Sequence, residues 1–498
     1  MKKNNNKKLY IIFTILLIIF SISIVEKTMQ NDTFFTIPIA KEMIERGGLD
    51  GIDHLTQHEK LKFTHSGWIF DLIIYGVYSV FDFFGIYILT ILITIIISIV
   101  VFNTLLKEEN NILLSFIVTL FAMFISSGVF AARGQIFSFL IFTIEIYAIT
   151  RLEKTGKKRY IITLLILPII LANTHDTVWP FYFVMFLPYI AEGIVSKIKL
   201  LNENEPYKIV VKDIKQLKVM IIIMIVSAIT GLITPVFGTA YINLFTVMEG
   251  VSKTFIQELQ TVDIFSSIPL LTIVFLIIGI IGFTKTKIRL KDLLYVFGFT
   301  ILSFMAARNC YFLYLLGIIS ICNIITEFLK TYNKNKDLEN ITNSLEKNKI
   351  YLIILIIIIA LISLAGITSN MNKEYIDETR YPVETVKWIK NNIDIENMTI
   401  YNQFNYGSYL ELNGIKVFMD SRSGIYCEEF TEGSTIMTDY INVEEGIVNY
   451  KSIFENYGIT HVMLTNDSLI NQYICYDSEY ECIYQDDNFV LYEKNVDI

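Results

Sequence analysis

The feature that most constrains this chain is a set of long apolar runs with almost no charged side chains. Clear examples are residues 9–25, 84–106, 112–130, 219–236 and 350–367. Each run is close to the roughly 20 residues that an α-helix needs to cross the hydrocarbon core of a bilayer. Such runs together indicate a polytopic membrane protein and exclude a soluble globular enzyme.

The composition of the 498-residue chain agrees with this interpretation. Hydrophobic residues make up 53% of the chain and charged residues only 18%, against about a quarter in ordinary soluble proteins. The net charge of −8 argues against a basic face that binds nucleic acid. Disorder is also excluded, because a chain this apolar can offset the entropy cost of ordering.

The distribution of basic residues predicts the membrane topology. Eleven spans are predicted at 9–25, 84–106, 112–130, 135–150, 160–172, 177–195, 219–236, 267–284, 292–307, 310–328 and 350–367. The stretch 67–82 is either a twelfth span or an amphipathic helix at the membrane interface. With eleven spans, the predicted cytoplasmic loops hold 25 basic residues and the outer loops 8, as the positive-inside rule requires. We therefore predict an amphipathic helix at 67–82 and a cytoplasmic N-terminus in the plasma membrane.

The last predicted span delivers residues 368–498 to the outer face. This segment holds 8 basic and 23 acidic residues, a balance of −15. Helix-like patterns alternate with strand-like ones, which predicts a small α/β domain. The predicted helices are 383–391 and 446–457, and the predicted strands are 398–401, 416–419, 459–464 and 489–493. The expected organisation is a transmembrane domain over 1–367, with its first outer loop at 26–66, and an extracytoplasmic domain over 368–498.

Polar and ionisable residues gather at the span ends that this topology places outside. Charged groups beside spans with little loop around them are costly unless they line a wet cavity or pair with one another. We therefore expect one shared outer site, for which the candidates are Asp32, Asp53, His65, Arg133, Asn173, His175, Glu258, Arg308 and Asn309.

Each candidate also has an ordinary structural explanation. Asp32 could be a solvated residue just past a helix end, and Arg133 and Arg308 could reach lipid phosphates. His175 fits a hydrogen-bonded residue at the membrane interface, and Glu258 fits an amphipathic helix. Only their shared side of the membrane sets these residues apart.

Several short motifs follow one another in order along the chain. They are NDTFF, IERGGLDGID and THSGW in the first outer loop, then ARGQIFSFLIF, ANTHDTVW, TPVFG, AARNCYFLY and the tail run NYGSYLELNGIKVFMDSRSGIY. With these motifs the chain resembles the C superfamily of glycosyltransferases (GT-C), in an uncharacterised bacterial and archaeal branch similar to mannosyltransferases that use dolichyl-phosphate-mannose. Tyr406, Ser421 and Thr234 depart from the Trp, Gly and Asn that are usual there.

The resemblance implies transfer of a sugar from a polyprenyl-phosphate-linked donor to a glycan, lipid or protein acceptor at the outer face. It assigns Asp32 as the general base for the acceptor hydroxyl and Asp53 as a second catalytic carboxylate. The departing phosphate needs its charge stabilised. The candidates for that role are Arg133, His175, Arg308 and His65, with Asn173, Glu258 and Asn309 beside them. A divalent metal ion (Mg²⁺ or Mn²⁺) is allowed but not required.

Several alternatives stay open. Asp420, Arg422 and Tyr426 form a local polar cluster that either binds the acceptor or lets Asp420 and Arg422 pair to hold a turn. The whole chain could instead be a non-catalytic scaffold or receptor for lipid-linked glycans. A transporter ranks last, because no pair of related halves with charges at mid-membrane is visible in the sequence.

Overall fold

The structure is a computed structural model that describes residues 2–59, 61–198, 208–238, 241, 257–263, 267–428 and 431–495. The chain divides into two compact units. Unit 1 contains Met1–Glu26, Tyr87–Tyr241 and Ile256–Asn372, and unit 2 contains Lys27–Ile86 and Lys373–Ile498. The predicted first outer loop therefore groups with the C-terminal segment rather than with the helical bundle.

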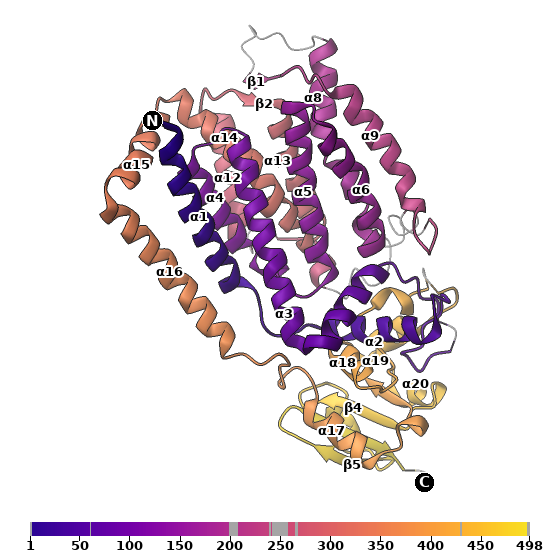
Figure 1. Cartoon of the computed structure of the whole chain (residues 1–498). Helices are drawn as coiled ribbons and strands as arrows, with labels where there is room; N and C mark the ends of the chain where they lie inside the picture. The colour runs from indigo at the N-terminus through magenta and orange to yellow at the C-terminus, as the bar shows by residue number, and fades with distance from the viewer. Residues whose placement is uncertain are drawn as a thin grey trace. The chain divides into compact units, whose positions relative to one another are not determined.

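Unit 1 is a bundle of helices (Figure 1). The bounds are α1 Lys2–Ile24, the later part of α3 (Trp68–Lys107), α4 Ile112–Ile125, α5 Gly134–Thr155, α6 Lys158–Thr174, α7 Phe181–Val184, α8 Leu187–Ile198, α9 Leu217–Ile229, α12 Ile268–Phe283, α13 Leu290–Met305, α14 Ile318–Thr331, α15 Asn335–Lys347 and α16 Lys349–Met371. A π-helix, Phe312–Gly317, leads into α14. Each predicted span coincides with a helix or a short series of helices.

Six helices in the described part of the chain are long and apolar enough to cross a membrane, and three shorter ones are also apolar. Helix α16 is apolar, yet most of its surface is exposed: the side chains of Ile350 and Leu361 are each more than half accessible. Contact with lipid explains such an exposed apolar surface. The membrane helical class is therefore confirmed, while the count of eleven spans stays a prediction.

The predicted amphipathic helix 67–82 forms the first part of α3. Asp82 interrupts α3 with φ 55° and ψ −158°, a backbone conformation that non-glycine residues rarely adopt. The Phe83 N–H donates to Oδ1 of Asp82 at 2.8 Å, which partly compensates for the helical hydrogen bonds lost at the break. The break lies between the segment 67–82 and the span 84–106 that the sequence predicts, and the placement of 67–82 at the membrane interface stays a prediction.

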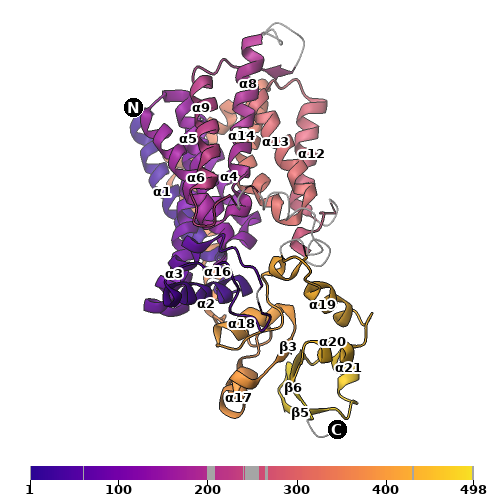
Figure 2. The same ribbon diagram turned by 90° about the vertical axis from the view of Figure 1, so that its right-hand side faces the viewer.

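Several loops predicted to be cytoplasmic lie at one end of unit 1. Strand β1 (Ile209–Val210) pairs in parallel with β2 (Ile288–Arg289). Figures 1 and 2 show both the C-terminal end of α8 and the start of α1 at this same end. This shared end agrees with the predicted alternation of the spans.

Unit 2 contains a four-stranded mixed sheet in the order β3–β4–β6–β5. Strand β3 pairs in parallel with β4, with Ile400 opposite His461, and β6 is antiparallel to both β4 and β5. The strands are β3 Ile400–Asn402, β4 His461–Thr465, β5 Tyr480–Gln485 and β6 Phe489–Lys494. The helices are α2 Asn31–Arg46, α17 Val383–Asn392, α18 Gly407–Leu412, α19 Ile436–Glu444, α20 Tyr450–Asn456 and α21 Asn471–Ile474. Figure 2 shows α17 on one side of the sheet and α20 and α21 on the other.

The predicted α/β character of the tail is present, but two details differ. Residues 416–419 do not form a strand: Val417 makes only one bridge, to Thr56, and the Phe418 N–H donates to the side-chain oxygen of Asn402. Strand β5 was not predicted, because its side chains are mostly exposed and its pattern is polar. All five cysteines are free thiols.

Candidate functional site

The structure distributes the candidate residues between the two units. Unit 1 holds Arg133, Asn173, His175, Glu258, Arg308 and Asn309. Unit 2 holds Asp32, Asp53, His65, Asp420, Arg422 and Tyr426.

In unit 1, Arg133 and Glu258 form a bidentate ion pair. Nη1 of Arg133 donates to Oε1 of Glu258 at 2.8 Å, and Nη2 donates to Oε2 at 3.2 Å. Arg133 is the residue just before α5, and Glu258 lies in the 3₁₀ turn Gln257–Leu259. Partial burial raises the pKa of Glu258, but the hydrogen bond and the charges of Arg133 and Arg308 outweigh it and hold the pKa below its usual value. Glu258 is therefore an anion held by the arginine.

His175 lies beside this pair, between α6 and the turn that follows it. Its Nδ1 is 2.7 Å from the hydroxyl of Ser138, which lies in the second turn of α5. Burial, together with the nearby positive charges of Arg308 and Arg133, lowers the pKa of His175 to about 3. The imidazole is therefore neutral near pH 7. It can offer a hydrogen bond to a phosphate but not the positive charge that we expected of it.

Backbone contacts hold the segments that carry the remaining residues of unit 1. Nδ2 of Asn173 donates to the carbonyl oxygen of Ile233 at 2.8 Å, which ties the end of α6 to the turn after α9. Arg308 and Asn309 lie in the 3₁₀ turn Ala307–Asn309 after α13. The Ala307 N–H donates to the carbonyl of Gln260 at 3.0 Å, so the Glu258 segment is fastened beside the Arg308 turn. Arg133, His175, Glu258 and Arg308 thus share one neighbourhood, which we call the arginine group of unit 1.

In unit 2, Arg422 is the centre of a buried ion cluster. Its Nη1 donates to Oδ1 of Asp53 at 2.5 Å, and its Nη2 donates to Glu411 at 2.7 Å and to Asp420 at 2.5 Å. The hydroxyl of Tyr426 donates to Asp420 at 2.6 Å. Arg422 is only 8% exposed and Asp420 fully buried. These five residues form the Arg422 cluster.

Within the Arg422 cluster, Asp420 and Arg422 also pair locally. The backbone N–H of Arg422 donates to Oδ1 of Asp420 at 2.5 Å, which is the contact expected of a pair that holds a turn. Burial raises the pKa of Asp420, but Arg422 lowers it by more. Burial raises the pKa of Glu411 well above its usual value, and the charge of Arg422 lowers it by less.

Asp53 is engaged on both carboxylate oxygens. One accepts from Arg422, and the other accepts the Thr56 N–H at 2.9 Å. Asp53 is 5% exposed. This geometry gives Asp53 a structural role in holding its loop, and its role as a second catalytic carboxylate stays a prediction. The geometry also argues against a metal ion at the cluster, because the guanidinium already occupies the space between the acids. Among the described residues, no group of three or more His, Cys, Asp or Glu side chains is arranged to hold a metal ion.

His65 and Asp32 differ in their surroundings. His65 is 8% exposed and its ring lies against Phe63, with centroids 4.3 Å apart. Burial and the charge of Arg422 lower the pKa of His65 to about 4, so it too is neutral near pH 7. Asp32 is half-buried in the first turn of α2, where exposed N–H groups favour a carboxylate.

Unit 2 also contains a cavity of about 560 Å³ that no pattern in the sequence indicates. It is lined by Asn31, Thr379, Arg380, Tyr381, Gln403, Phe404, Asn405, Tyr406, Tyr440, Glu444 and Thr465. These residues come from five separate segments, so no local motif marks them. The start of α2, which carries Asp32, forms one of its walls.

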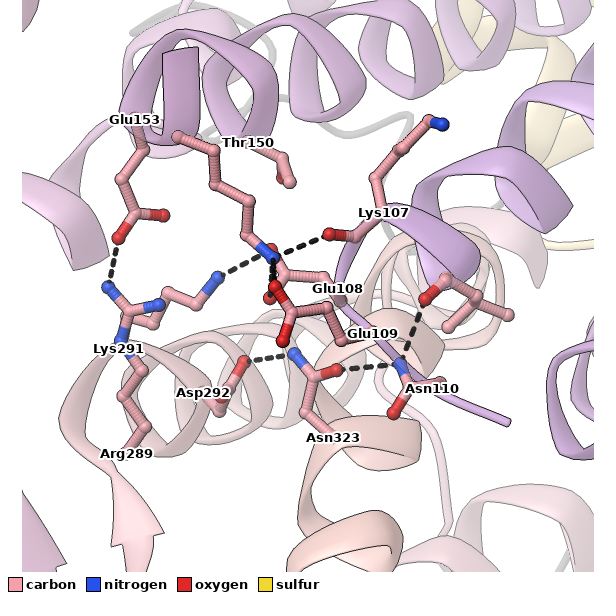
Figure 3. Close-up of polar contacts among 12 residues, drawn as sticks. Lys107, Glu108, Glu109, Asn110, Thr150, Glu153, Arg289, Lys291, Asp292 and Asn323 are labelled. Carbon is pink, nitrogen blue, oxygen red and sulfur yellow. Dashed lines mark hydrogen bonds and ion pairs between the residues drawn. The ribbon is translucent and has the colours of Figure 1, made fainter. Parts of the chain in front are cut away.

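A buried polar network at the other end of unit 1 was also missed. Figure 3 shows Lys291 reaching Glu108, at 3.0 Å, and Arg289 reaching Glu153, at 2.5 Å. Asp292 accepts from Asn323 at 3.0 Å in the same network. Arg133 and Glu153 are separated by nearly the whole of α5, whose 22 residues span about 33 Å. This network is therefore distinct from the arginine group.

Comparisons with known proteins bear on the fold. No protein-family profile matches the chain, and no curated protein matches it in sequence. The oligosaccharyltransferase AglB of Archaeoglobus fulgidus, tethered with an acceptor peptide that contains the NVT sequon, is similar with a TM-score of 0.59 at 10% identity, over 92% of this chain and 69% of AglB. ArnT of Cupriavidus metallidurans bound to undecaprenyl phosphate is similar with a TM-score of 0.55 at 10% identity, over 98% of both chains. This chain has the GT-C fold. The resemblance seen in the motifs is thereby confirmed at the level of fold, and the chain is a membrane protein.

Proposed function

We propose that this protein is an integral-membrane glycosyltransferase that moves a sugar from a polyprenyl-phosphate-linked donor to an acceptor at the outer face of the membrane. The observation that carries the proposal is the arginine group of unit 1 in a chain with the GT-C fold. Two structural neighbours support the donor class: AglB has been solved with a dolichol-phosphate and ArnT with undecaprenyl phosphate.

We assign the donor phosphate to the arginine group. Arg133 and Arg308 carry permanent positive charge, and a guanidinium matches phosphate oxygens with two parallel hydrogen bonds. His175, neutral and oriented through Ser138, adds a hydrogen bond from its Nε2. Groups held in place before the reaction stabilise the negative charge that develops on the leaving phosphate.

We assign the acceptor proton to Asp32. An acceptor hydroxyl is a weak nucleophile until a carboxylate takes its proton. Asp53, the other carboxylate considered, is bound to Arg422 and positions the loop instead. In the proposed step the acceptor oxygen forms a bond to the sugar C1 while the bond from C1 to the phosphate oxygen breaks. The proton passes to Asp32, and the lipid phosphate leaves with the electron pair. No part of this step requires a metal ion.

The decisive experiment uses purified full-length protein in lipid nanodiscs with radiolabelled polyprenyl-phosphate-linked sugars from native membranes. We expect Asp32→Asn to slow sugar transfer by about 10²–10⁴-fold while binding of undecaprenyl phosphate and thermal stability stay unchanged. Asp50→Asn is the matched control, because Asp50 is a partly exposed acid of the same loop that contacts His54. Sugar transfer by the Asp32→Asn variant at the wild-type rate would contradict the assignment of Asp32 as the general base. Binding of undecaprenyl phosphate without turnover by the wild type would favour the scaffold alternative.

A further inference from the structure

We infer that the cavity of unit 2 is the acceptor site and that it takes a hydroxyl-rich glycan. The inference rests on the proposed glycosyl transfer, because it names the acceptor class of that reaction. The position of the cavity, the polar groups in its walls and its relation to Asp32 support it.

The cavity lies at the carboxyl ends of two parallel strands. Residues 403–406 directly follow β3, and Thr465 is the last residue of β4. Strand β3 is labelled in Figure 2 and strand β4 in Figure 1, and the two are neighbours in the sheet of unit 2. In α/β sheets, ligands bind outside the carboxyl ends of the parallel strands, where loops diverge. The volume of about 560 Å³ falls in the range of roughly 300–1,000 Å³ that is typical of pockets for small organic ligands.

Glu444, the last residue of α19, supplies a carboxyl group that is held in place by neutral donors. Its Oε1 accepts from the hydroxyl of Tyr401 at 2.8 Å, and its Oε2 accepts from Nε2 of Gln403 at 2.8 Å. Oε1 of Gln403 accepts the Thr465 N–H at 3.0 Å, which fixes the direction of the amide. Burial raises the pKa of Glu444. The hydrogen bonds from Gln403 and Tyr401 lower this pKa by a smaller amount, and no charged side chain contributes to the shift. Each carboxyl oxygen keeps a second lone pair for a ligand.

Asn31 supplies a second acceptor in the cavity wall. Its Nδ2 donates to the carbonyl oxygen of Asn405 at 2.5 Å, while its buried Oδ1 has no hydrogen-bond partner among the described residues. This oxygen is shielded from water, so Asn31 accepts from a ligand hydroxyl only if its amide turns toward the cavity, which would relieve the cost of a buried acceptor without a partner. Arg380 and Asn405, both exposed, add donors at the rim.

The remaining walls are aromatic, with Tyr381, Phe404, Tyr406 and Tyr440. Side chains that combine ring surface with carboxyl and amide groups match a sugar ring, which has apolar C–H faces and a rim of hydroxyls. A peptide would instead be recognised chiefly by main-chain hydrogen bonds along a strand edge. The groups around this cavity are side chains, which favours a glycan.

The cavity also stands beside the proposed base. Asn31 lines the cavity and Asp32 is the next residue of α2. The pKa of Tyr381, another wall residue, is raised by burial, and the negative charge of Asp32 adds to the effect. A glycan held by Glu444 and Asn31 would therefore present a hydroxyl near the Asp32 carboxylate.

The test measures saccharide binding separately from catalysis. Saturation-transfer NMR on the full-length protein in nanodiscs is recorded with maltotriose, mannotriose and chitotriose, and with an Asn-Val-Thr peptide. We expect at least one trisaccharide to bind. Glu444→Gln should weaken that binding by about tenfold or more, because the hydroxyl loses a bond to a carboxyl group. Glu445→Gln, an exposed neighbour, is the matched control and should bind as wild type does.

Asn405→Trp provides a second variant that does not disturb the Glu444 bonds. Asn405 is exposed, so the indole should fill the cavity without unfolding the unit, and trisaccharide binding should disappear. Binding of the peptide alone, or of no trisaccharide, would overturn the glycan assignment. Donor turnover separates the two proposals: Asp32→Asn should keep trisaccharide binding while losing transfer. If the protein releases sugar from the donor but binds no saccharide, the proposed function stands and only the acceptor site is rejected.

Discussion

Nη1 of Arg422 lies 2.5 Å from Oδ1 of Asp53, although 369 residues separate the two in the sequence. The contact fastens the first loop to the C-terminal part within unit 2. Two neighbouring hydrogen bonds do the same: the Gln57 N–H donates to the carbonyl of Val417 at 3.0 Å, and His58 Nε2 lies 2.7 Å from the carbonyl of Phe418. A buried ion pair therefore holds the segment that carries Asp32 to the C-terminal part of unit 2.

The first prediction concerns loss of Arg422. Arg422→Met should reduce the free energy of unfolding of unit 2 by about 3–5 kcal/mol, because it leaves the carboxylates of Asp53 and Asp420 buried without their cation. Thermal unfolding of the purified protein measures the loss of stability, and limited proteolysis shows whether unit 2 is the part that unfolds.

Arg380→Met is the control for removing one arginine from unit 2. Arg380 is exposed, and within the described residues its side chain forms a local ion pair with Asp377 at 3.4 Å. Its removal should change stability by less than about 1 kcal/mol. Equal effects of the two variants would show that the Arg422 cluster does not stabilise the unit.

The second prediction concerns acid sensitivity. The pKa of His65 falls from 6.5 in the unfolded chain to about 4 in the folded protein, so the unfolded chain binds the extra proton between these values. The contribution to stability is present above pH 6.5 and is lost as the pH falls toward 4, at most roughly 3 kcal/mol. His65→Gln should flatten the stability curve in this window when chemical unfolding is measured from pH 7 to pH 4.

His54→Gln is the comparison for that pH series. His54 is partly exposed and lies 2.7 Å from Asp50, outside the Arg422 cluster. The slope between pH 6.5 and 4 should stay close to the wild-type slope in this variant. A His65→Gln curve that keeps the full wild-type slope would show that protonation of His65 does not drive the acid loss.

Local patterns predicted the parts of the fold that depend on neighbouring residues. The helix expected at 383–391 is α17, and the distorted residue Asp82 lies between the segment expected at 67–82 and the span expected at 84–106. Asp420 and Arg422 are two residues apart, so their pairing could be anticipated from the chain itself. Periodicity and spacing suffice for such features because the interacting groups are close in sequence.

The partners of Asp53 could not be anticipated in this way. Its carboxylate meets Arg422 through the folding of unit 2, and a single sequence carries no mark of a contact over 369 residues. The motif resemblance therefore assigned Asp53 to catalysis. The cavity was missed for the same reason, since Asn31, Tyr381 and Glu444 reach it from distant segments. Burial also explains why the two histidines expected to be cations are neutral.

The third prediction follows from the ion pair of Arg133 with Glu258. Under the proposed function, the Glu258 carboxylate competes with the donor phosphate for the same guanidinium. Glu258→Gln should strengthen binding of undecaprenyl phosphate by about two- to fivefold, the range expected for removing one partly exposed ion pair. Native mass spectrometry of the purified protein with undecaprenyl phosphate and with undecaprenol measures the effect.

Glu327→Gln removes the same charge elsewhere in unit 1. Glu327 is exposed and pairs with Lys330 at 2.7 Å, so its loss should leave lipid binding unchanged. Weaker binding by Glu258→Gln would mean that the carboxylate supports the geometry of Arg133 rather than competing for it. Equal binding of undecaprenol and undecaprenyl phosphate by the wild type would argue against phosphate recognition altogether.

The last prediction tests the network in Figure 3. Lys291 is 2% exposed, and its Nζ donates to Glu108 at 3.0 Å and to the hydroxyl of Tyr189 at 3.1 Å. Lys291→Met keeps the length of the side chain but leaves the Glu108 carboxylate with too little positive charge, so unfolding should become easier by about 3–5 kcal/mol. Lys330→Met, which breaks an exposed pair, should cost less than about 1 kcal/mol.

The double variant Lys291→Met/Glu108→Leu removes both charges and should recover much of the lost stability, because replacing a buried ion pair with apolar side chains often leaves stability unchanged. Denaturant unfolding in detergent gives all three values, and a double variant no more stable than Lys291→Met would show that the unpaired carboxylate is not the cause.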